Sequence, residues 1–193
     1  IFPAICLVVS GGHTELILMK NFEKFEKIGQ TLDDAAGECL DKVAKFLGLD
    51  YPGGPAIAEK AAKLKIENCK LKIDRLPRPM VNSPDFNFSF SGLKTAVLYK
   101  TRELGSSQIS KFIPLICHEV QQAIIDVLIK KTLRAVQKYK ARSIILGGGV
   151  AANDELRKQF KLKIENSQLK INFFVPPKNL CTDNAVMVAV AGY

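Results

Sequence analysis

Four short segments of the sequence combine glycines and polar residues in patterns that could hold an anionic ligand. The first is Ser10-Gly11-Gly12-His13-Thr14, directly after an apolar run. Glycines carry no Cβ, so their backbone N–H groups can turn toward a phosphate. The same motif is typical of a tight hairpin, in which His13 would be a neutral residue with a local hydrogen bond. The motif alone therefore leaves both interpretations open.

The second segment is acidic and lies in a helix-like pattern. Asp34, Glu38 and Asp41 are spaced i, i+4 and i+7 and would share one helix face. A carboxylate held at a fixed depth on such a face can accept both hydroxyls of a ribose. A solvated acidic stripe explains the spacing equally well.

The third and fourth segments follow predicted strands further along the chain. Gly147-Gly148-Gly149 would allow close approach of a ligand, and Asn153 follows them. Cys181-Thr182-Asp183-Asn184 opens the last predicted helix. Asn153 and Asp183 are both ordinary helix N-cap residue types, so a capping role competes with ligand binding for Asn153 and with metal binding for Asp183.

Apolar runs and turn residues predict elements in mixed order. Strands are expected over 4–9, 15–20, 25–29, 86–90, 143–146 and 171–175. The strand–turn–strand setting of Ser10–Thr14 is not a Rossmann fingerprint, which needs a helix directly after the glycines. The chain is therefore an α/β protein with glycine turns at strand ends, where ligands bind in open α/β sheets.

Helices are expected between these strands. Asp33 or Asp34 would cap one running to about Leu47, with Gly48 as its C′ residue. Others are predicted from 53 toward 63, from 91, after 153 and from Thr182 or Asp183. Residues 107–140 predict one or two buried helices, with Pro114 as an early break.

Composition favours an intracellular protein. The five cysteines are odd in number, widely spaced and without a C-x-x-C pattern, which indicates reduced thiols rather than disulfides or a thiolate zinc site. There is no run of about 18 uncharged apolar residues and no signal peptide. We expect a cytoplasmic location, no membrane partner, and a chain that is cut at both ends.

The net charge of +9 is concentrated in two segments that also repeat each other. Residues 60–78 carry seven Lys/Arg against two acidic residues, and residues 157–170 carry five against one. Lys63–Asp74 and Lys161–Asn172 agree at nine of twelve positions. Both repeats begin with an alternating Lys-Leu-Lys-Ile pattern. This alternation of lysine and apolar residues predicts short edge strands or surface arms, inserted near 60–78 and 157–172. Charge alone favours a solvated lysine face over a nucleic-acid contact.

The motifs together resemble one family, the tRNA threonylcarbamoyladenosine transferases (the TsaD/Gcp family, once called O-sialoglycoprotein endopeptidases). The resemblance rests on six stretches in family order that span nearly all of 1–193 apart from the basic segments. These are Val8–Leu16, Asp33–Lys42, Gly48–Pro55, Phe88–Thr95, Gly148–Asn153 and Cys181–Asn184. It implies an actin/sugar-kinase/Hsp70-like (ribonuclease H-like) fold, incomplete and mainly its C-terminal subdomain.

The resemblance also implies roles for particular residues. Val8, Val9, Ser10, Gly11, Gly12 and, with less weight, His13 would line threonylcarbamoyl-AMP, with the Ser10–Gly12 turn at its phosphate. Asp41 would bind the ribose, and Gly54 and Asn153 would complete the pocket. The implied reaction transfers the threonylcarbamoyl group to the adenosine beside the anticodon of tRNAs that read codons starting with A. The implied partners are tRNA, a paralogous TsaB-like subunit and a TsaE-like ATPase.

The match is incomplete at the metal. The resemblance implies one divalent iron or zinc-like ion per subunit, with Asp183 as one ligand. Its two histidine ligands belong to an H-x-x-x-H motif, whereas this chain has only His13 and His118, which are not so spaced. The chain alone is therefore expected to be inactive, as the second half of a transferase. The alternatives are a small-molecule kinase or ATPase of the same fold, a non-catalytic partner subunit and, last, a protease.

Overall fold

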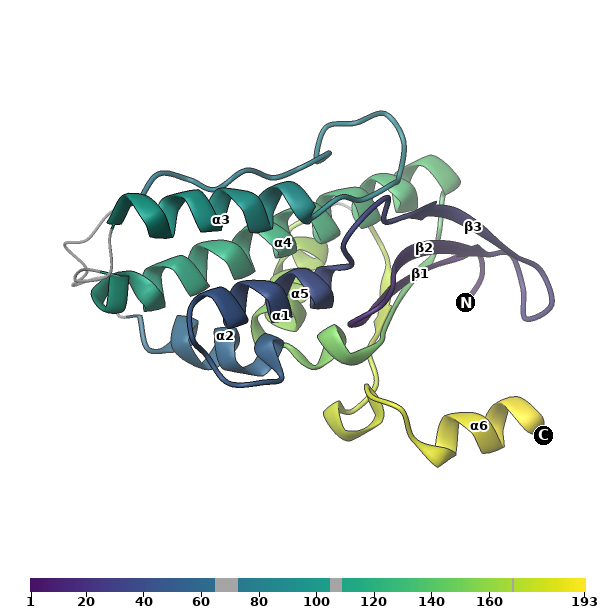
Figure 1. Ribbon diagram of the computed structural model, residues 1–193. Coiled ribbons are helices and arrows are strands. Elements are labelled where there is room, and N and C mark those ends of the chain that lie inside the picture. The colour runs from purple at the N-terminus through teal and green to yellow at the C-terminus, as the bar shows by residue number, and fades with distance from the viewer. Residues whose placement is uncertain (65–72, 105–108, 168) are drawn as a thin grey trace.

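A five-stranded mixed sheet forms one side of the structure, and helices pack against it from the other side (Figure 1). The computed structural model describes residues 1–64, 73–104, 109–167 and 169–193. The strands lie in the order β3-β2-β1-β4-β5. Their bounds are β1 Ala4–Val9, β2 Thr14–Met19, β3 Phe25–Gln30, β4 Ser143–Gly147 and β5 Asn172–Phe174.

Strand direction decides which turns meet. β1, β2 and β3 are antiparallel neighbours, so short hairpin turns join them. β4 is parallel to β1, and β5 is parallel to β4. The carboxyl ends of β1 and β4 therefore lie at the same edge of the sheet, which brings two of the predicted glycine turns together.

Helices cover one face of the sheet (Figure 1). Ile5, Leu7 and Val9 of β1 and Leu16 of β2 are fully buried on this face, within one core cluster. Alternate positions of a strand point to opposite faces, which explains the spacing of these residues. The helices are α1 Ala36–Phe46, α2 Gly53–Ala62, α3 Ser91–Leu104, α4 Ile109–Tyr139, α5 Asp154–Glu165 and α6 Ala185–Gly192, with short 3-10 helices at Gly149–Ala152 (η2) and Lys178–Leu180 (η3).

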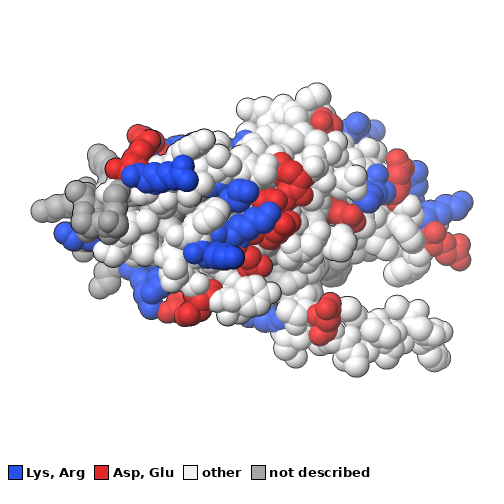
Figure 2. Space-filling view, in the orientation of Figure 1, with Lys and Arg blue, Asp and Glu red and all other residues white. Residues whose placement is uncertain are grey.

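The other face of the sheet is apolar and partly open. Cys6, Val8, Ile17 and Ile145 line a shallow hollow of about 290 Å³ there. Helix α6 stands apart from the sheet as an uncharged arm (Figures 1 and 2). None of its residues is buried.

Helix α4 is long and apolar enough to cross a membrane by length and composition, but 56% of its most apolar window is buried inside the protein. It packs against α2 and β1 as the central core helix. The predicted break at Pro114 is wrong, because the helix continues through it. Proline this near the start removes one backbone hydrogen bond, and the buried residues that follow hold the helix together.

Two predicted helix starts are also wrong. Helix α1 has Ala35 at its N-cap position, with no side-chain cap, because the Asp33 carboxylate instead accepts hydrogen bonds at the start of α3. Helix α6 is capped by Asn184, whose Oδ1 accepts from the Met187 N–H at 3.1 Å, and so begins after Asp183. Gly48 does follow α1 with a positive φ of 68°, as predicted.

Two predicted strands take other forms. Residues 86–90 form only an isolated bridge, between Phe88 and Thr31. Of the two basic repeats, 65–72 lies outside the described residues, and 161–165 belongs to α5 rather than to an edge strand. Residues 161–165 are helical because they continue the buried stripe of α5, which consists of Leu156, Phe160 and Ile164 at i, i+4 and i+8.

Candidate functional site

The Ser10–His13 turn is held by its own polar groups. The Ser10 N–H donates to the His13 carbonyl at 2.8 Å, and the His13 N–H donates to Ser10 Oγ at 3.0 Å. A Cβ added at Gly11 or Gly12 would meet nothing within 4 Å. The turn therefore presents two glycines to open space, as a backbone anion site requires.

Helix α1 begins against this turn. The Gly37 N–H donates to the Ser10 carbonyl at 3.1 Å, and a Cβ at Gly37 would lie 2.5 Å from the same oxygen. The Ala36 N–H donates to the buried Thr14 Oγ1 at 2.9 Å. Glycine at position 37 thus lets the positive end of α1 lie directly behind the turn.

The turn after β4 contacts the end of β1 from the other side. Gly148 has φ +89°, and a Cβ there would lie 2.3 Å from the Val9 carbonyl oxygen. Next to it, a Cβ at Gly149 would lie 3.9 Å from Thr182 Cγ2, so the 181–184 segment also reaches this edge. The sheet edge therefore brings together three of the four predicted segments.

The remaining segment, the acidic one that was described second, lies on α1. Asp41 lies four residues beyond Gly37, about 6 Å further along the helix axis. Its Oδ1 accepts from the Gly53 N–H at 2.7 Å. A Cβ at Gly53 would lie 2.6 Å from the Asp41 Cα, so glycine allows α2 to begin against α1. Gly54 follows at the same helix start, with only Leu40 Cδ1 nearby at 3.8 Å.

The acidic face of α1 is partly neutralised. Lys42 Nζ lies 2.6 Å from Asp34 Oδ1 and 2.8 Å from Glu38 Oε1. The hydrogen bond to Lys42 lowers the pKa of Glu38, and the two carboxylates raise the pKa of Lys42. Asp34 precedes the helix rather than lying within it. The three carboxylates therefore have different surroundings, and Asp41 is the one that contacts the start of α2.

Several predicted residues also have structural roles. Val8 and Val9 point to opposite faces of the sheet, and the Val9 side chain is buried in the core, so only its backbone is available to a ligand. Asn153 caps α5 by accepting from the Leu156 N–H at 3.0 Å, while its Nδ2 donates to Gln121 Oε1 at 2.8 Å. The hydrogen bond to Gln121 could not be predicted from the sequence, because it joins residues that are far apart in the chain.

The predicted metal ligand is isolated in this structure. Asp183 is exposed beside the start of α6. Over the described ranges, no group of three or more His, Cys, Asp or Glu residues could hold a metal ion. His13 is exposed on the hairpin and His118 is half-buried in α4. One exposed carboxylate does not make a metal site, so the described residues do not by themselves fit the metal, and we derive no chemical step through it.

The buried thiols are poor nucleophiles. Burial raises the pKa of Cys6 to about 11. It raises those of Cys39 and Cys117 to about 12. Because the thiolate is the reactive form, these side chains stay protonated and unreactive at neutral pH. All four cysteines of the described residues are free.

These features define an α/β protein with a candidate ligand site where β1 and β4 end.

Comparison with known proteins identifies the family. The model of the TsaD family, described as tRNA N6-adenosine threonylcarbamoyltransferase, matches residues 1–190. This chain therefore belongs to the TsaD family, which has the actin-like fold, and the predicted fold class is confirmed.

Individual relatives bear the same name. A tRNA N6-adenosine threonylcarbamoyltransferase of Syntrophomonas wolfei is 50% identical over 188 residues, covering 97% of this chain and 53% of that protein. Those of Thermosipho africanus and Bacillus subtilis are 48% and 47% identical over 191 and 199 residues, and cover 99% and 100% of this chain. The chain spans 55% and 54% of those two proteins, so it matches about half the length of these relatives.

Proposed function

We propose that the whole protein transfers a threonylcarbamoyl group from threonylcarbamoyl-AMP to the exocyclic amine of the adenosine next to the anticodon of tRNA. The substrate tRNAs would be those that read codons starting with A. The observation that carries the proposal is that the Ser10–Gly12 turn and the Gly148 turn meet at one sheet edge, with Asp41 further along α1 where α2 begins at Gly53 and Gly54. Such an edge is where open α/β sheets hold nucleotides.

We propose a role for each part. The backbone of Gly11 and Gly12 would approach the phosphate, a role supported by the open space around an added Cβ at either glycine, which would meet no described residue other than its chain neighbours within 4 Å. Asp41 would accept the ribose hydroxyls with Oδ2, for which no hydrogen bond is found in the described part of the chain. Gly54 and the 148–153 turn would close the nucleotide pocket. Held in this way, the adenylate would be fixed in line for attack.

The reaction needs no covalent enzyme intermediate. The adenosine amine attacks the carbamoyl carbon, the bond from that carbon to the phosphate oxygen breaks, AMP leaves and the amine loses a proton. The raised thiol pKa values support direct attack, because Cys6, Cys39 and Cys117 would not compete as nucleophiles. Asp183 would be one ligand of the divalent metal that the resemblance implies.

The alternatives are less well supported. The match to a transferase family does not favour a kinase, an ATPase or a protease. A non-catalytic subunit is expected to lack Asp41, Asn153 and Asp183, which are present. The TsaB-like and TsaE-like partners and a cytoplasmic location are proposed from the resemblance alone.

The test is the effect of Asp41→Asn on adenylate binding by the whole protein. Asparagine can still accept from the Gly53 N–H, so the fold is retained while the charge is lost. Because a hydrogen bond to a charged group contributes about 1.5–3 kcal/mol, the Kd for the adenylate is expected to rise about 10- to 100-fold. Asp50→Asn, at an exposed carboxylate on the loop after α1, is the matched control. Equal affinities in the two variants would remove Asp41 from the site.

A second measurement tests the metal. Asp183→Ala is expected to lower both the metal content of the purified whole protein and its transfer rate. Unchanged metal content and unchanged rate would refute the role of Asp183.

A further inference from the structure

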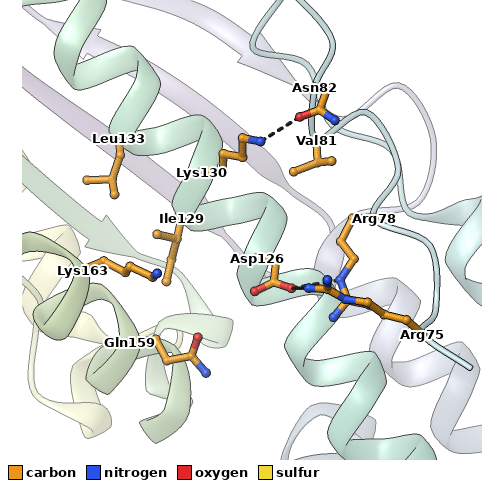
Figure 3. Close-up of a pocket in the computed structure, with 10 residues that line it drawn as sticks. All are labelled: Arg75, Arg78, Val81, Asn82, Asp126, Ile129, Lys130, Leu133, Gln159 and Lys163. Atoms are coloured by element: carbon orange, nitrogen blue, oxygen red, sulfur yellow. Dashed lines mark hydrogen bonds and ion pairs between the residues drawn. The ribbon is translucent and has the colours of Figure 1, made fainter. Parts of the chain in front are cut away.

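A groove of about 550 Å³ lies away from the glycine turns, between the 73–83 segment, α4 and α5 (Figure 3). Ile129 and Leu133 of α4 form part of an apolar floor. Arg75, Lys130 and Lys163 stand around it on three different parts of the chain.

The groove joins the two basic segments found in the sequence. Arg75 and Arg78 come from the 60–78 segment, and Lys163 comes from the 157–172 segment. Lys130 of α4 lies between them (Figure 3). Three basic residues from two distant stretches of the sequence therefore lie around one concave surface.

The cations of the groove are of two kinds. Arg78 is 10% exposed and pairs with Asp126 and Glu119, so it serves to hold the 73–83 segment on α4. Arg75 is 75% exposed, with one contact to Asp126 at 3.3 Å. Lys130 contacts only the neutral Asn82 among the described residues, at 2.7 Å. Exposed cations with so little neutralisation attract an anionic partner.

The groove is connected to the candidate site along α4 and α5. At the site, Asn153 is bonded to Gln121 at 2.8 Å. Gln122, the next residue of α4, and Gln159, six residues after Asn153, exchange hydrogen bonds of 2.9 and 2.7 Å. Lys163 lies ten residues after Asn153, about 15 Å along the helix axis. A polyanion that extends from the site along these helices would reach the groove.

We propose that this groove binds the phosphate backbone of the RNA substrate at a distance from the reacting adenosine. Lysine and arginine bind phosphates without reading sequence. No aromatic side chain lines the groove in the part of the chain that the structure describes, so bases would not stack there. The inference rests on the proposed function for the identity of the RNA, and it adds a second contact surface to that function.

The test compares two double variants of the whole protein. Lys130→Gln with Lys163→Gln removes two groove charges. Lys158→Gln with Lys161→Gln removes two exposed charges from α5 outside the groove lining. Binding of unmodified substrate tRNA is measured over a range of salt concentrations. Loss of two phosphate contacts should weaken binding about tenfold at low salt, and should reduce the slope of log K against log salt by about 1.4–1.8.

Three further measurements distinguish the explanations. Transfer at saturating tRNA should keep its rate in the groove variant while the KM for tRNA rises. Polyglutamate and phosphatidylserine vesicles test an acidic protein or a membrane as the true partner. The melting temperature checks folding, and the single variant Lys163→Gln replaces the double variant if folding is impaired.

Equal tRNA affinity and salt slope in the groove and control variants would overturn the proposal. So would a loss of polyglutamate or vesicle binding with tRNA binding unchanged. Failure of the proposed function looks different, because the unmodified whole protein would then transfer nothing to tRNA.

Discussion

Gly148→Ala is expected to damage both the fold and the candidate site. Gly148 has φ +89° and ψ 167°, a region of backbone conformation that is essentially restricted to glycine. An added Cβ would also lie 2.3 Å from the carbonyl oxygen and 2.8 Å from the carbonyl carbon of Val9. These are backbone atoms at the end of the central strand β1, so the clash cannot be relieved by a flexible side chain moving aside.

The magnitude follows from two contributions. The strained backbone conformation costs about 1–3 kcal/mol. Overpacking in a close-packed interior costs typically about 1–3 kcal/mol more. Partial relaxation of the β1–β4 edge makes the two costs less than additive, so we expect a loss of about 2–5 kcal/mol in the free energy of unfolding.

The assay is urea unfolding of the whole protein, with adenylate affinity measured in parallel. Gly147→Ala is the matched control, because a Cβ there meets nothing within 4 Å and its φ is ordinary. Alanine in a strand is expected to be neutral or to stabilise by up to about 1 kcal/mol relative to glycine. The Gly148 variant should unfold at lower urea with an unchanged m-value and bind the adenylate more weakly. Equal midpoints for the two variants would refute the close contact between the strand ends.

Three other predictions concern ionisable groups. Burial acts to raise the pKa of Asp33, but hydrogen bonds from hydroxyls and amides at the start of α3 lower it overall. Because the carboxylate is exposed and solvent screens it, Asp33→Ala should cost only about 1 kcal/mol at neutral pH, measured by urea midpoints. The charge-dependent part of this cost should be lost as the pH falls below about 4. Lys131 is fully buried, donates to Ser83 Oγ at 2.7 Å, and has a pKa lowered by burial despite Asp85. Because the unfolded state then binds the proton more readily, stability should rise with pH toward about 10.4, and Lys131→Met should flatten that rise in thermal melts at graded pH. The three thiols of raised pKa should react with a thiol reagent only as fast as the protein opens, so labelling as fast as in urea-unfolded protein would contradict their burial.

Much of the sheet could be predicted from the sequence, for a physical reason. Strands β1, β2 and β4 are largely apolar runs that end at glycines or polar turns, so their pattern is local. The site segments were predicted as separate motifs at strand ends, and the parallel pairing of β1 with β4 brings two of them together. Which face Val8 and Val9 present also follows from the period of a strand, although only the structure shows which face carries the helices.

The errors arose where two local solutions compete and a distant partner decides. Asp33 is an acceptable cap for α1, but the start of α3 lies close to it in space and supplies more hydrogen-bond donors. The 161–165 repeat alternates like a strand, yet Phe160 and Ile164 continue a buried helical stripe from earlier residues. The groove could not be predicted at all, because it depends on how 73–83, α4 and α5 pack together.

The glycines of the site separate architecture from ligand binding. Gly37, Gly53 and Gly148 are each crowded by backbone atoms of another element at 2.3–2.6 Å from an added Cβ, so the fold itself requires glycine there. Gly11 and Gly12 are not crowded by any atom within 4 Å. The fold therefore does not explain glycine at these two positions, whereas close approach of a ligand to the backbone does. The three crowded glycines fix the sheet edge and the helix starts, and the uncrowded turn at Gly11 and Gly12 is where we propose that the adenylate phosphate binds.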